Sequence, residues 1–304
     1  MRMIVTGGAG FIGSHVAETL LNAGHEVLIL DNFSTGKKTN LPEGISFLEV
    51  DICRDDLNKI FLDFKPEAVC HLAAQIDVRK SILDPAYDAY VNIVGAAKLL
   101  EACKEAKVKK VIYSSSAAVY GEPQFLPVSE EHQIRPLSAY GISKHTVEHY
   151  LVVYKELYGI DYSILRYGNV YGPRQDPLGE AGVVAIFTDK VLKDEIPTIY
   201  GDGKQTRDFV FVKDIARANL LAAETKGSQL VNIATGVETS VNDVFNLLCQ
   251  MAGKDHLKAN YLPERSGEIR RMVMTKEKAK VEIGFAYKYS FAEGIKETLA
   301  YYKD

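Results

Sequence analysis

The sequence predicts an α/β protein built on a doubly wound parallel sheet, with a smaller C-terminal α/β part. Three observations support this fold class. Short apolar runs alternate with helical patterns through the first half of the chain, a glycine cluster follows the first run, and the alternation stops after Gly172-Pro173-Arg174. Regular alternation of strand and helix favours parallel strands, because each helix returns the chain to the same end of the sheet.

Each expected strand of the sheet is a short apolar run. The strands are expected at residues 3–6, 26–30, 46–49, 68–72, 110–114, 162–167 and 230–234. The helices between them are expected at residues 14–23, 55–64, 88–106 and 138–158. Because 304 residues are many for one core, we expect two domains. The first covers residues 1–174 with a return near 208–235, and the second covers 175–207 and 236–304.

The glycine cluster has the spacing of a phosphate-binding turn. Gly8, Gly10 and Gly13 form Gly-x-Gly-x-x-Gly, and Gly7 with the last two gives a second phase, Gly-x-x-Gly-x-x-Gly. Glycines permit a tight turn and let backbone N–H groups approach a pyrophosphate at the start of a helix. The spacing alone is weak evidence, because glycine-rich turns are common.

Acidic residues end the next two predicted strands. Asp31 lies eighteen residues after Gly13, where a carboxylate can bind both hydroxyls of an adenosine ribose. The alternative is an ordinary βαβ turn with a surface aspartate. The full order of strand, turn, helix, strand and acid favours a Rossmann-type domain that binds NAD, since an acid disfavours the 2′-phosphate of NADP. Asp51 either faces the adenine or caps the following helix.

The composition is that of an ordinary globular protein, with 47% hydrophobic residues, 25% charged residues and a net charge of −4. This charge gives no footprint for nucleic acid or an anionic membrane, although local arginines can bind an anionic substrate. The four cysteines lie far apart and predict neither a zinc site nor a disulfide framework. The first strand leaves no room for a signal peptide, and no apolar run approaches the roughly 18–20 residues of a membrane span. We expect a cytoplasmic protein.

Two polar segments carry the expected chemistry. The serines of 114–116 follow an apolar run and should lie at the carboxyl edge of a central strand. If Ser138 caps the next helix, Tyr140 and Lys144 lie one turn apart on one face. Lowering a tyrosine pKa from about 10 to about 7 requires roughly 4 kcal/mol of phenolate stabilisation. A lysine ammonium and the positive ring of an oxidised nicotinamide can supply it.

The tyrosine–lysine pair alone is weak evidence for catalysis, because such pairs four residues apart are common on helices. The same predicted helix also carries Tyr150, Tyr154 and Tyr158. Together with an NAD turn and a serine-rich strand end, the pair favours proton transfer.

Several segments form a set that spans nearly the whole chain. They read Thr6-Gly-Gly-Ala-Gly-Phe-Ile-Gly13, His71-Leu-Ala-Ala74, Ser114-Ser-Ser-Ala-Ala-Val-Tyr-Gly121, Tyr140-x-x-x-Lys144, Arg166-Tyr-Gly-Asn-Val-Tyr-Gly-Pro-Arg174, Tyr200-Gly-Asp-Gly203, Arg207-Asp-Phe-Val210 and Arg265-Ser-Gly-Glu268. This set resembles the extended short-chain dehydrogenase/reductase superfamily and, within it, the UDP-glucose 4-epimerases.

The resemblance implies an epimerase mechanism. Tyr140 removes the proton of the sugar 4-hydroxyl while hydride passes from C4 to NAD, and Lys144 binds the nicotinamide ribose and lowers the pKa of Tyr140. Ser116 hydrogen-bonds the 4-oxygen. The 4-keto sugar then turns over, hydride returns to its opposite face, and NAD stays bound throughout. The resemblance also implies a homodimer that packs the helices near 88–106 and 138–158.

The resemblance further implies which residues contact each ligand. Those for NAD are Gly7, Gly10, Phe11, Ile12, Asp31, Asn32, Asp51, Ile52, Leu72, Asn92, Tyr140, Lys144 and Tyr167. Those for the UDP-sugar are Ser116, Asn169, Val183, Tyr200, Arg207, Arg265 and Glu268. Two arginines can neutralise a diphosphate through charge-assisted contacts, although a single arginine is more often a solvated surface charge.

Two positions depart from the family pattern. Members often carry Asn near the diphosphate where this chain has Gly182-Val183, so that contact is expected from the backbone alone. Met272 occupies a position where members have either a bulky aromatic or a small residue, which in the family helps decide whether an N-acetyl group fits. Methionine is flexible, so acceptance of acetamido sugars stays open.

The nearest alternatives are a nucleotide-sugar 4,6-dehydratase or decarboxylase of the same fold. Such members typically carry an acid two residues after Ser116, and dehydratases an Asp before that acid. Here these places hold Ala117 and Ala118, which cannot transfer protons. A non-catalytic NAD-sensing protein commonly loses the tyrosine or the lysine, and both are present. A net oxidoreductase that releases NADH is the remaining alternative.

Overall fold

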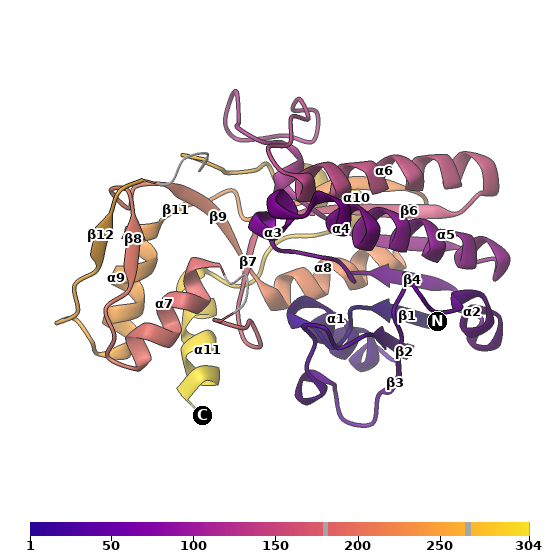
Figure 1. The fold of residues 1–304 in the computed structure, drawn as a ribbon, viewed down its shortest axis with the longest axis horizontal. Helices are drawn as coiled ribbons and strands as arrows, with labels where there is room; N and C mark the ends of the chain where they lie inside the picture. The colour runs from indigo at the N-terminus through magenta and orange to yellow at the C-terminus, as the bar shows by residue number, and fades with distance from the viewer. Residues whose placement is uncertain (179–181, 265–268, 304) are drawn as a thin grey trace.

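The computed structural model describes residues 1–178, 182–264 and 269–303, and Figure 1 shows its fold. A seven-stranded sheet forms the centre of the described chain, in the order β10-β6-β5-β4-β1-β2-β3. Every adjacent pair in it is parallel. Its strands are β1 Arg2–Thr6, β2 Glu26–Asp31, β3 Ser46–Glu49, β4 Ala68–His71, β5 Lys110–Ser116, β6 Asp161–Tyr167 and β10 Gln229–Ile233.

Helices connect the strands and cover both faces of the sheet. The α-helices of the described chain, around this sheet and beyond it, are α1 Phe11–Asn22, α2 Leu57–Phe64, α3 Val78–Leu83, α4 Pro85–Ala89, α5 Gly95–Glu105, α6 Ala139–Tyr158, α7 Val183–Leu192, α8 Val212–Glu224, α9 Val241–Ala252, α10 Glu277–Ile283 and α11 Phe291–Lys303. Shorter turns are η1 Lys38–Asn40, η2 Tyr90–Val94 and η3 Ala117–Val119. None of the helices in the described ranges is both long enough and apolar enough to cross a membrane.

Alternating side chains divide the core of the sheet into two layers. Met3 and Val5 pack into one layer with Val16 of α1 and Ile215 of α8. Ile4 points into the other layer, which α2, α5 and α6 cover. Successive strand side chains point to opposite faces, so a sheet buried on both faces needs apolar residues throughout each strand. The predicted doubly wound parallel fold is confirmed.

A second group of elements lies beside the central sheet, on the left of Figure 1. A three-stranded sheet has the order β11-β9-β7, and a two-stranded sheet pairs β12 with β8. These strands are β7 Asn169–Tyr171, β8 Thr198–Tyr200, β9 Thr206–Phe211, β11 Glu238–Ser240 and β12 Asn260–Leu262. Apolar side chains of α7, α9 and α11, such as Phe187, Leu248 and Ile295, form their own core cluster. The chain returns to the central sheet where β10 pairs with β6, and again where Ala279 and Ile283 of α10 pack into the core layer of that sheet.

The helix predicted at 88–106 has a different start and a wide turn in its middle. It begins earlier because the Asp84 carboxylate accepts a hydrogen bond from the Tyr87 N–H (3.0 Å) and Pro85 occupies the first helical position. The turn η2 that separates α4 from α5 is a π-helix, which holds one residue more than an α-helical turn. Asn92 lies within this turn and is buried.

The start of α6 agrees with the predicted cap. The Ser138 hydroxyl oxygen accepts a hydrogen bond from the Gly141 N–H (3.1 Å). The Tyr140 N–H, which has no partner within its own helix, donates to the Ser81 hydroxyl of α3 (3.1 Å). The cap of α6 itself and the Ser81 side chain of α3 therefore fix the turn that carries Tyr140.

A buried ion pair fixes the middle of α6 against the sheet. The Glu148 carboxylate accepts from Arg166 Nε of β6 (2.9 Å) and Nη2 (2.6 Å), and from the Ser115 hydroxyl of β5 (2.6 Å). His145 Nδ1 lies 3.0 Å from the same carboxylate. The two charged side chains are only 3% and 4% exposed. Removing one partner of such a pair leaves the other charge buried without compensation.

We expect Glu148→Gln to lower the free energy of unfolding by about 3–5 kcal/mol, because the Arg166 guanidinium would lose its buried counter-ion. Urea denaturation measures the change. Glu195→Gln is the matched control, since it breaks an exposed pair with Lys190 and should cost less than about 1 kcal/mol.

The same pair makes stability depend on acid. Burial raises the pKa of Glu148, but hydrogen bonds from Arg166 and His145 outweigh burial and lower the pKa to about 2. A group with a depressed folded-state pKa stabilises the fold above its unfolded pKa of about 4.3 and loses that effect as the pH falls. The difference between wild type and Glu148→Gln should therefore shrink from about pH 5 toward pH 2. If Glu148→Gln and Glu195→Gln lowered the free energy of unfolding by the same amount, the buried ion pair would not have the role assigned to it.

Candidate active site

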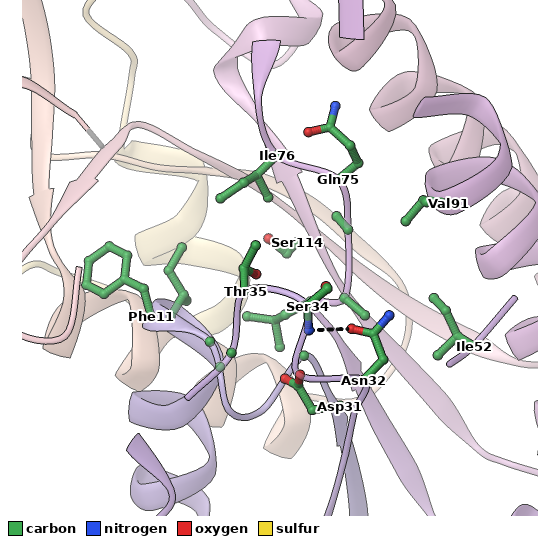
Figure 2. Close-up of a pocket in the computed structure, with 18 of the residues that line it drawn as sticks. Phe11, Asp31, Asn32, Ser34, Thr35, Ile52, Gln75, Ile76, Val91 and Ser114 are labelled. Carbon is green, nitrogen blue, oxygen red and sulfur yellow. Dashed lines mark hydrogen bonds between the residues drawn. The ribbon is translucent and has the colours of Figure 1, made fainter. Parts of the chain in front are cut away.

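A cavity of about 880 Å³ lies at the carboxyl edge of the central sheet (Figure 2). The glycine turn, the segments that follow β2, β3, β4 and β5, and the first turns of α6 surround it. The chain passes from β1 to β2 on one side, whereas β4 lies on the other side of β1. Open α/β sheets bind ligands where the strand order reverses in this way.

The glycine turn leaves the start of α1 open toward the cavity. Gly7 has a φ of +70°, and a Cβ on Gly13 would lie 2.0 Å from the Gly7 carbonyl oxygen, so no larger side chain fits there. Gly10 begins α1 without a side-chain cap, and Phe11 and Ile12 line the cavity. Uncapped N–H groups and the positive end of the helix dipole fit a diphosphate.

Asp31 lines the cavity and also shapes it. Its carboxylate accepts hydrogen bonds from the Ala9 N–H (2.9 Å) and the Phe33 N–H (2.8 Å). The Ala9 carbonyl oxygen in turn accepts from the Lys37 N–H (3.0 Å) and the Asn40 side chain (3.0 Å). The segment after β2 is thereby folded beside the glycine turn. Each carboxylate oxygen keeps a second lone pair for a ribose hydroxyl.

Asp51 does not cap α2. Asp56 is the capping residue, since its carboxylate accepts from the N–H groups of Asn58 and Lys59. Asp51 instead accepts from the Cys53 N–H (2.8 Å) and lines the cavity. Of the two alternatives that the sequence left open, the capping role is excluded.

Tyr140, Lys144 and Ser116 meet at the same end of the cavity. The Lys144 ammonium donates to the Ser114 carbonyl oxygen (2.8 Å) and lies 5.7 Å from the Tyr140 ring centroid. The Ser116 side chain is close enough to Tyr140 to act on it, in the direction that lowers the pKa of the tyrosine. All three residues line the cavity, as does Tyr167, which closes the adjoining strand β6.

Burial pushes both ionisable groups toward their neutral forms. Burial raises the pKa of Tyr140 to about 12, although the Ser116 hydrogen bond acts in the opposite direction. Burial lowers the pKa of Lys144 to about 8. The resemblance implied that the pKa of Tyr140 is lowered, whereas the protein groups around Tyr140 raise that pKa. The physical reason is that desolvation of a phenolate in this enclosed position exceeds the stabilisation that its protein partners supply.

The structure brings most of the NAD residues implied by the resemblance around one cavity. They are Gly7, Gly10, Phe11, Ile12, Asp31, Asn32, Asp51, Ile52, Leu72, Tyr140, Lys144 and Tyr167. Asn92 is not among the residues that line it. Its amide is engaged by Gln75, Asp88 and Ser143 instead.

The residues implied for the UDP-sugar lie on the second group of elements. Asn169 begins β7, Val183 begins α7, Tyr200 ends β8 and Arg207 lies in β9. None of these four lines the cavity as described, whereas Ser116 does. Arg265 and Glu268 lie outside the described residues. Met272 is buried in a core cluster with Ala117, Tyr120 and Val128.

Sequence reasoning missed several segments of the cavity wall, and two of them directly follow strands. Residues 33–37 follow β2, and Gln75 and Ile76 follow β4. Figure 2 shows Ser34 and Thr35 beside Asn32, whose side chain accepts from the Ser34 N–H (3.1 Å). Their position in the sequence could have revealed them, because both segments directly follow predicted parallel strands.

The two alanines after Ser116 form the short turn η3. The Ser116 hydroxyl oxygen accepts from the Ala118 N–H (3.1 Å), and the Ala117 side chain is buried. Neither alanine can transfer a proton, so these two positions provide no acid or base beside Ser116.

One sheet edge thus combines a place for a dinucleotide diphosphate with a tyrosine–lysine pair that can move a proton. These features define an enzyme of the short-chain dehydrogenase/reductase class. Comparisons with known proteins narrow the class further. The model of the NAD dependent epimerase/dehydratase family matches residues 3–234. The chain therefore belongs to the NAD dependent epimerase/dehydratase family.

Three relatives illustrate the similarity. A putative UDP-glucose 4-epimerase of Methanocaldococcus jannaschii is 47% identical, over 99% of this chain and 98% of that protein. The crystal structure of Thermotoga maritima UDP-glucose 4-epimerase with UDP-glucose has a TM-score of 0.97 and 45% identity, over 100% of this chain and 99% of that one. The UDP-N-acetylglucosamine 4-epimerase of Methanobrevibacter ruminantium in complex with UDP-N-acetylmuramic acid has a TM-score of 0.95 and 39% identity, over 99% and 98%.

Proposed function

We propose that the protein interconverts UDP-glucose and UDP-galactose by oxidising C4 of the sugar and reducing it again on the opposite face. The observation that carries the proposal is the meeting of Tyr140, Lys144 and Ser116 beside two alanines. Epimerisation needs one group that takes and returns a proton. Elimination or decarboxylation chemistry needs a further acid or base, which Ala117 and Ala118 cannot provide.

The residues around the cavity fit NAD. The open N-terminus of α1 binds the diphosphate, Asp31 binds the adenosine ribose hydroxyls, and Lys144 binds the nicotinamide ribose. Bound NAD supplies a reversible acceptor for the C4 hydride.

Tyr140 serves as the proton acceptor for the 4-hydroxyl of the sugar. Its buried phenol has a raised pKa of about 12. Ionising it near pH 7 requires about 7 kcal/mol of stabilisation, at roughly 1.4 kcal/mol per pKa unit. The pKa of about 12 already includes the effect of Ser116, so the Lys144 ammonium and the positive charge of an oxidised nicotinamide ring are assigned this stabilisation. Ser116 also hydrogen-bonds the 4-oxygen.

The nucleotide end of the substrate is assigned to the second group of elements. Residues 175–207 and 236–304 form the substrate-binding domain in this proposal, and 1–174 with 208–235 form the NAD-binding domain. Asn169, Val183 and Tyr200 surround the UDP group, and Arg207 neutralises the diphosphate. β7 and β9 are adjacent strands, with Asn169 opposite Phe209, which supports a shared role for Asn169 and Arg207.

Epimerisation of a UDP-N-acetylhexosamine or a UDP-uronate is the main alternative, and a 4,6-dehydratase or decarboxylase is the weaker one. The likeness to a UDP-N-acetylglucosamine 4-epimerase favours keeping the acetamido alternative. Met272 packs in the core beside Ala117, so it would influence the sugar pocket through that packing.

We also propose that the protein is a homodimer in the cytoplasm. Tyr150, Val153 and Leu157 expose 39%, 48% and 66% of their surface at i, i+3 and i+7 along α6. Val94, 43% exposed, lines together with Tyr150 a groove of about 580 Å³ that α5, α6 and residues 54–58 surround. An apolar stripe of this kind is typical of an interface. All four cysteines are free thiols, which favours a reducing compartment.

UDP-galactose incubated with the NAD-loaded protein should yield UDP-glucose without net formation of NADH. NMR of the sugar nucleotides measures the products. Tyr140→Phe should lower kcat by at least about 100-fold, because it removes the proton acceptor, while NAD stays bound. A 4-keto-6-deoxy product would move the protein to the dehydratases, and near-normal turnover of Tyr140→Phe would refute the role of Tyr140.

Arg207→Ala should raise KM for the UDP-sugar roughly 10- to 100-fold, because a charge-assisted contact is worth about 1.5–3 kcal/mol. The NAD content of the purified protein should not change. Lys193→Ala is the control, since it removes the same charge from an exposed position on α7. Steady-state kinetics at saturating NAD decide the matter, and an unchanged KM would exclude the diphosphate contact.

Val153→Glu should convert the dimer to a monomer, because it places a charge in the apolar stripe of α6. Light scattering during size-exclusion chromatography measures the mass, which should be twice the 33.7 kDa of the chain for wild type. Val281→Glu on α10 is the control, since Val281 is also exposed but lies away from the stripe. A monomeric wild type would overturn the proposed dimer.

A further inference from the structure

A carboxylate that the proposed chemistry does not use is buried behind the cavity. Asp88 of α4 is only 1% exposed. Its Oδ1 accepts hydrogen bonds from Gln75 Nε2 (2.8 Å) and Asn92 Nδ2 (3.2 Å). Its Oδ2 is buried without a hydrogen-bond partner among the described residues. Burying a carboxylate with one oxygen left without a partner is costly, which points to a role for this group beyond packing.

Hydrogen bonds connect Asp88 to the cavity wall and to α6. Gln75 forms part of that wall in Figure 2, and its N–H donates to Asn92 Oδ1 (2.7 Å). Asn92 Nδ2 also donates to the Ser143 hydroxyl oxygen (3.0 Å). The Ser143 hydroxyl donates to the Tyr140 carbonyl oxygen (3.0 Å). The π turn η2 therefore joins the buried carboxylate to the backbone of the residue assigned as proton acceptor.

The ionisable groups near Asp88 come from three elements. Tyr140 and Lys144 project from α6, and Tyr113 projects from β5; the negative charge of Asp88 acts on all three. His71 of β4 is held neutral, because burial and the Lys144 charge lower its pKa to about 3. Glu148, one turn further along α6, is already neutralised by Arg166.

Lys144 has a neutral hydrogen-bond partner, the Ser114 carbonyl oxygen. Burial therefore favours the uncharged amine, and Asp88 opposes this by raising the pKa of Lys144. Asp88 also raises the pKa of Tyr140. The charge thus favours the ammonium and disfavours the phenolate, so it moves both titrations toward higher pH.

We propose that Asp88 is a positioning residue that keeps the Lys144 ammonium charged and, through Asn92 and Ser143, holds the turn of α6 that carries Tyr140. The inference rests on the proposed roles of Tyr140 and Lys144. The active pair needs a protonated lysine and an ionised tyrosine. Because the carboxylate raises both pKa values, its removal lowers both and moves the whole pH–rate profile toward acid.

Asp88→Asn is the test, because it removes the charge with little change of shape. Its amide oxygen can still accept from Gln75 and Asn92, and its amide nitrogen replaces the oxygen that has no partner. With NAD-loaded protein and UDP-galactose, the pH profile of kcat should move by about one unit toward acid. Asp88→Glu, which keeps the charge, should leave the profile near its wild-type position.

Two controls separate charge from structure. Asp84→Asn makes the same substitution at the exposed cap of α4 and should not move the profile. Ser143→Ala breaks the hydrogen-bond path to Tyr140 but keeps the charge, so it should lower kcat without moving the profile. If Asp88→Asn fails to fold, Asp88→Ser removes the same charge from a smaller side chain.

A readout without substrate keeps this inference distinct from the proposed function. Near-ultraviolet absorbance of the NAD-loaded protein, minus that of Tyr140→Phe, follows the ionisation of Tyr140. Its midpoint should also move by about one pH unit toward acid in Asp88→Asn. An absence of turnover with UDP-galactose together with this shift would overturn only the proposed function. Normal turnover with an unmoved midpoint, or a uniform loss of activity at every pH, would overturn the role of Asp88.

Discussion

The arrangement of the active site depends on one buried ion pair, between Glu148 and Arg166. It joins α6 to β5 and β6, the strands whose carboxyl ends carry Ser116 and Tyr167. Lys144 lies one turn and Tyr140 two turns before Glu148, so their distance from the serines follows from where that carboxylate is held. Packing alone would permit α6 to slide or rotate slightly, whereas a bidentate pair with correct geometry does not.

Desolvation of the Tyr140 and Lys144 side chains is the second constraint on the site. It moves Tyr140 and Lys144 toward neutral forms, the opposite of what proton transfer needs. Charges placed nearby must therefore restore the ionic forms, and the family's own cofactor carries one of them. Under the proposed role of Tyr140, bound NAD would also supply positive charge that favours the phenolate.

Sequence reasoning predicted the sheet, its strand positions and the cap at Ser138, because each depends on local patterns of apolar residues, glycines and hydroxyls. It also placed Asp31, Asp51 and the serines of 114–116 at one sheet edge, since parallel strands all end there. It could not find the Gln75–Asp88–Asn92 network, because those residues carry no periodic signal and meet only through tertiary contacts. It also left the role of Asp51 open, since a cap and a cavity residue look alike in sequence.

The wide turn η2 has a consequence for how this chain tolerates change in length. One additional residue separates α4 from α5, so the two helices are out of phase by about 100° relative to a continuous α-helix. Deleting a single residue there would restore regular winding. It would also turn either Asn92 away from Asp88 or Leu99 and Leu100 of α5 away from the core. A substitution in this helical segment changes only its immediate surroundings, whereas an insertion or deletion would change the geometry of the active site.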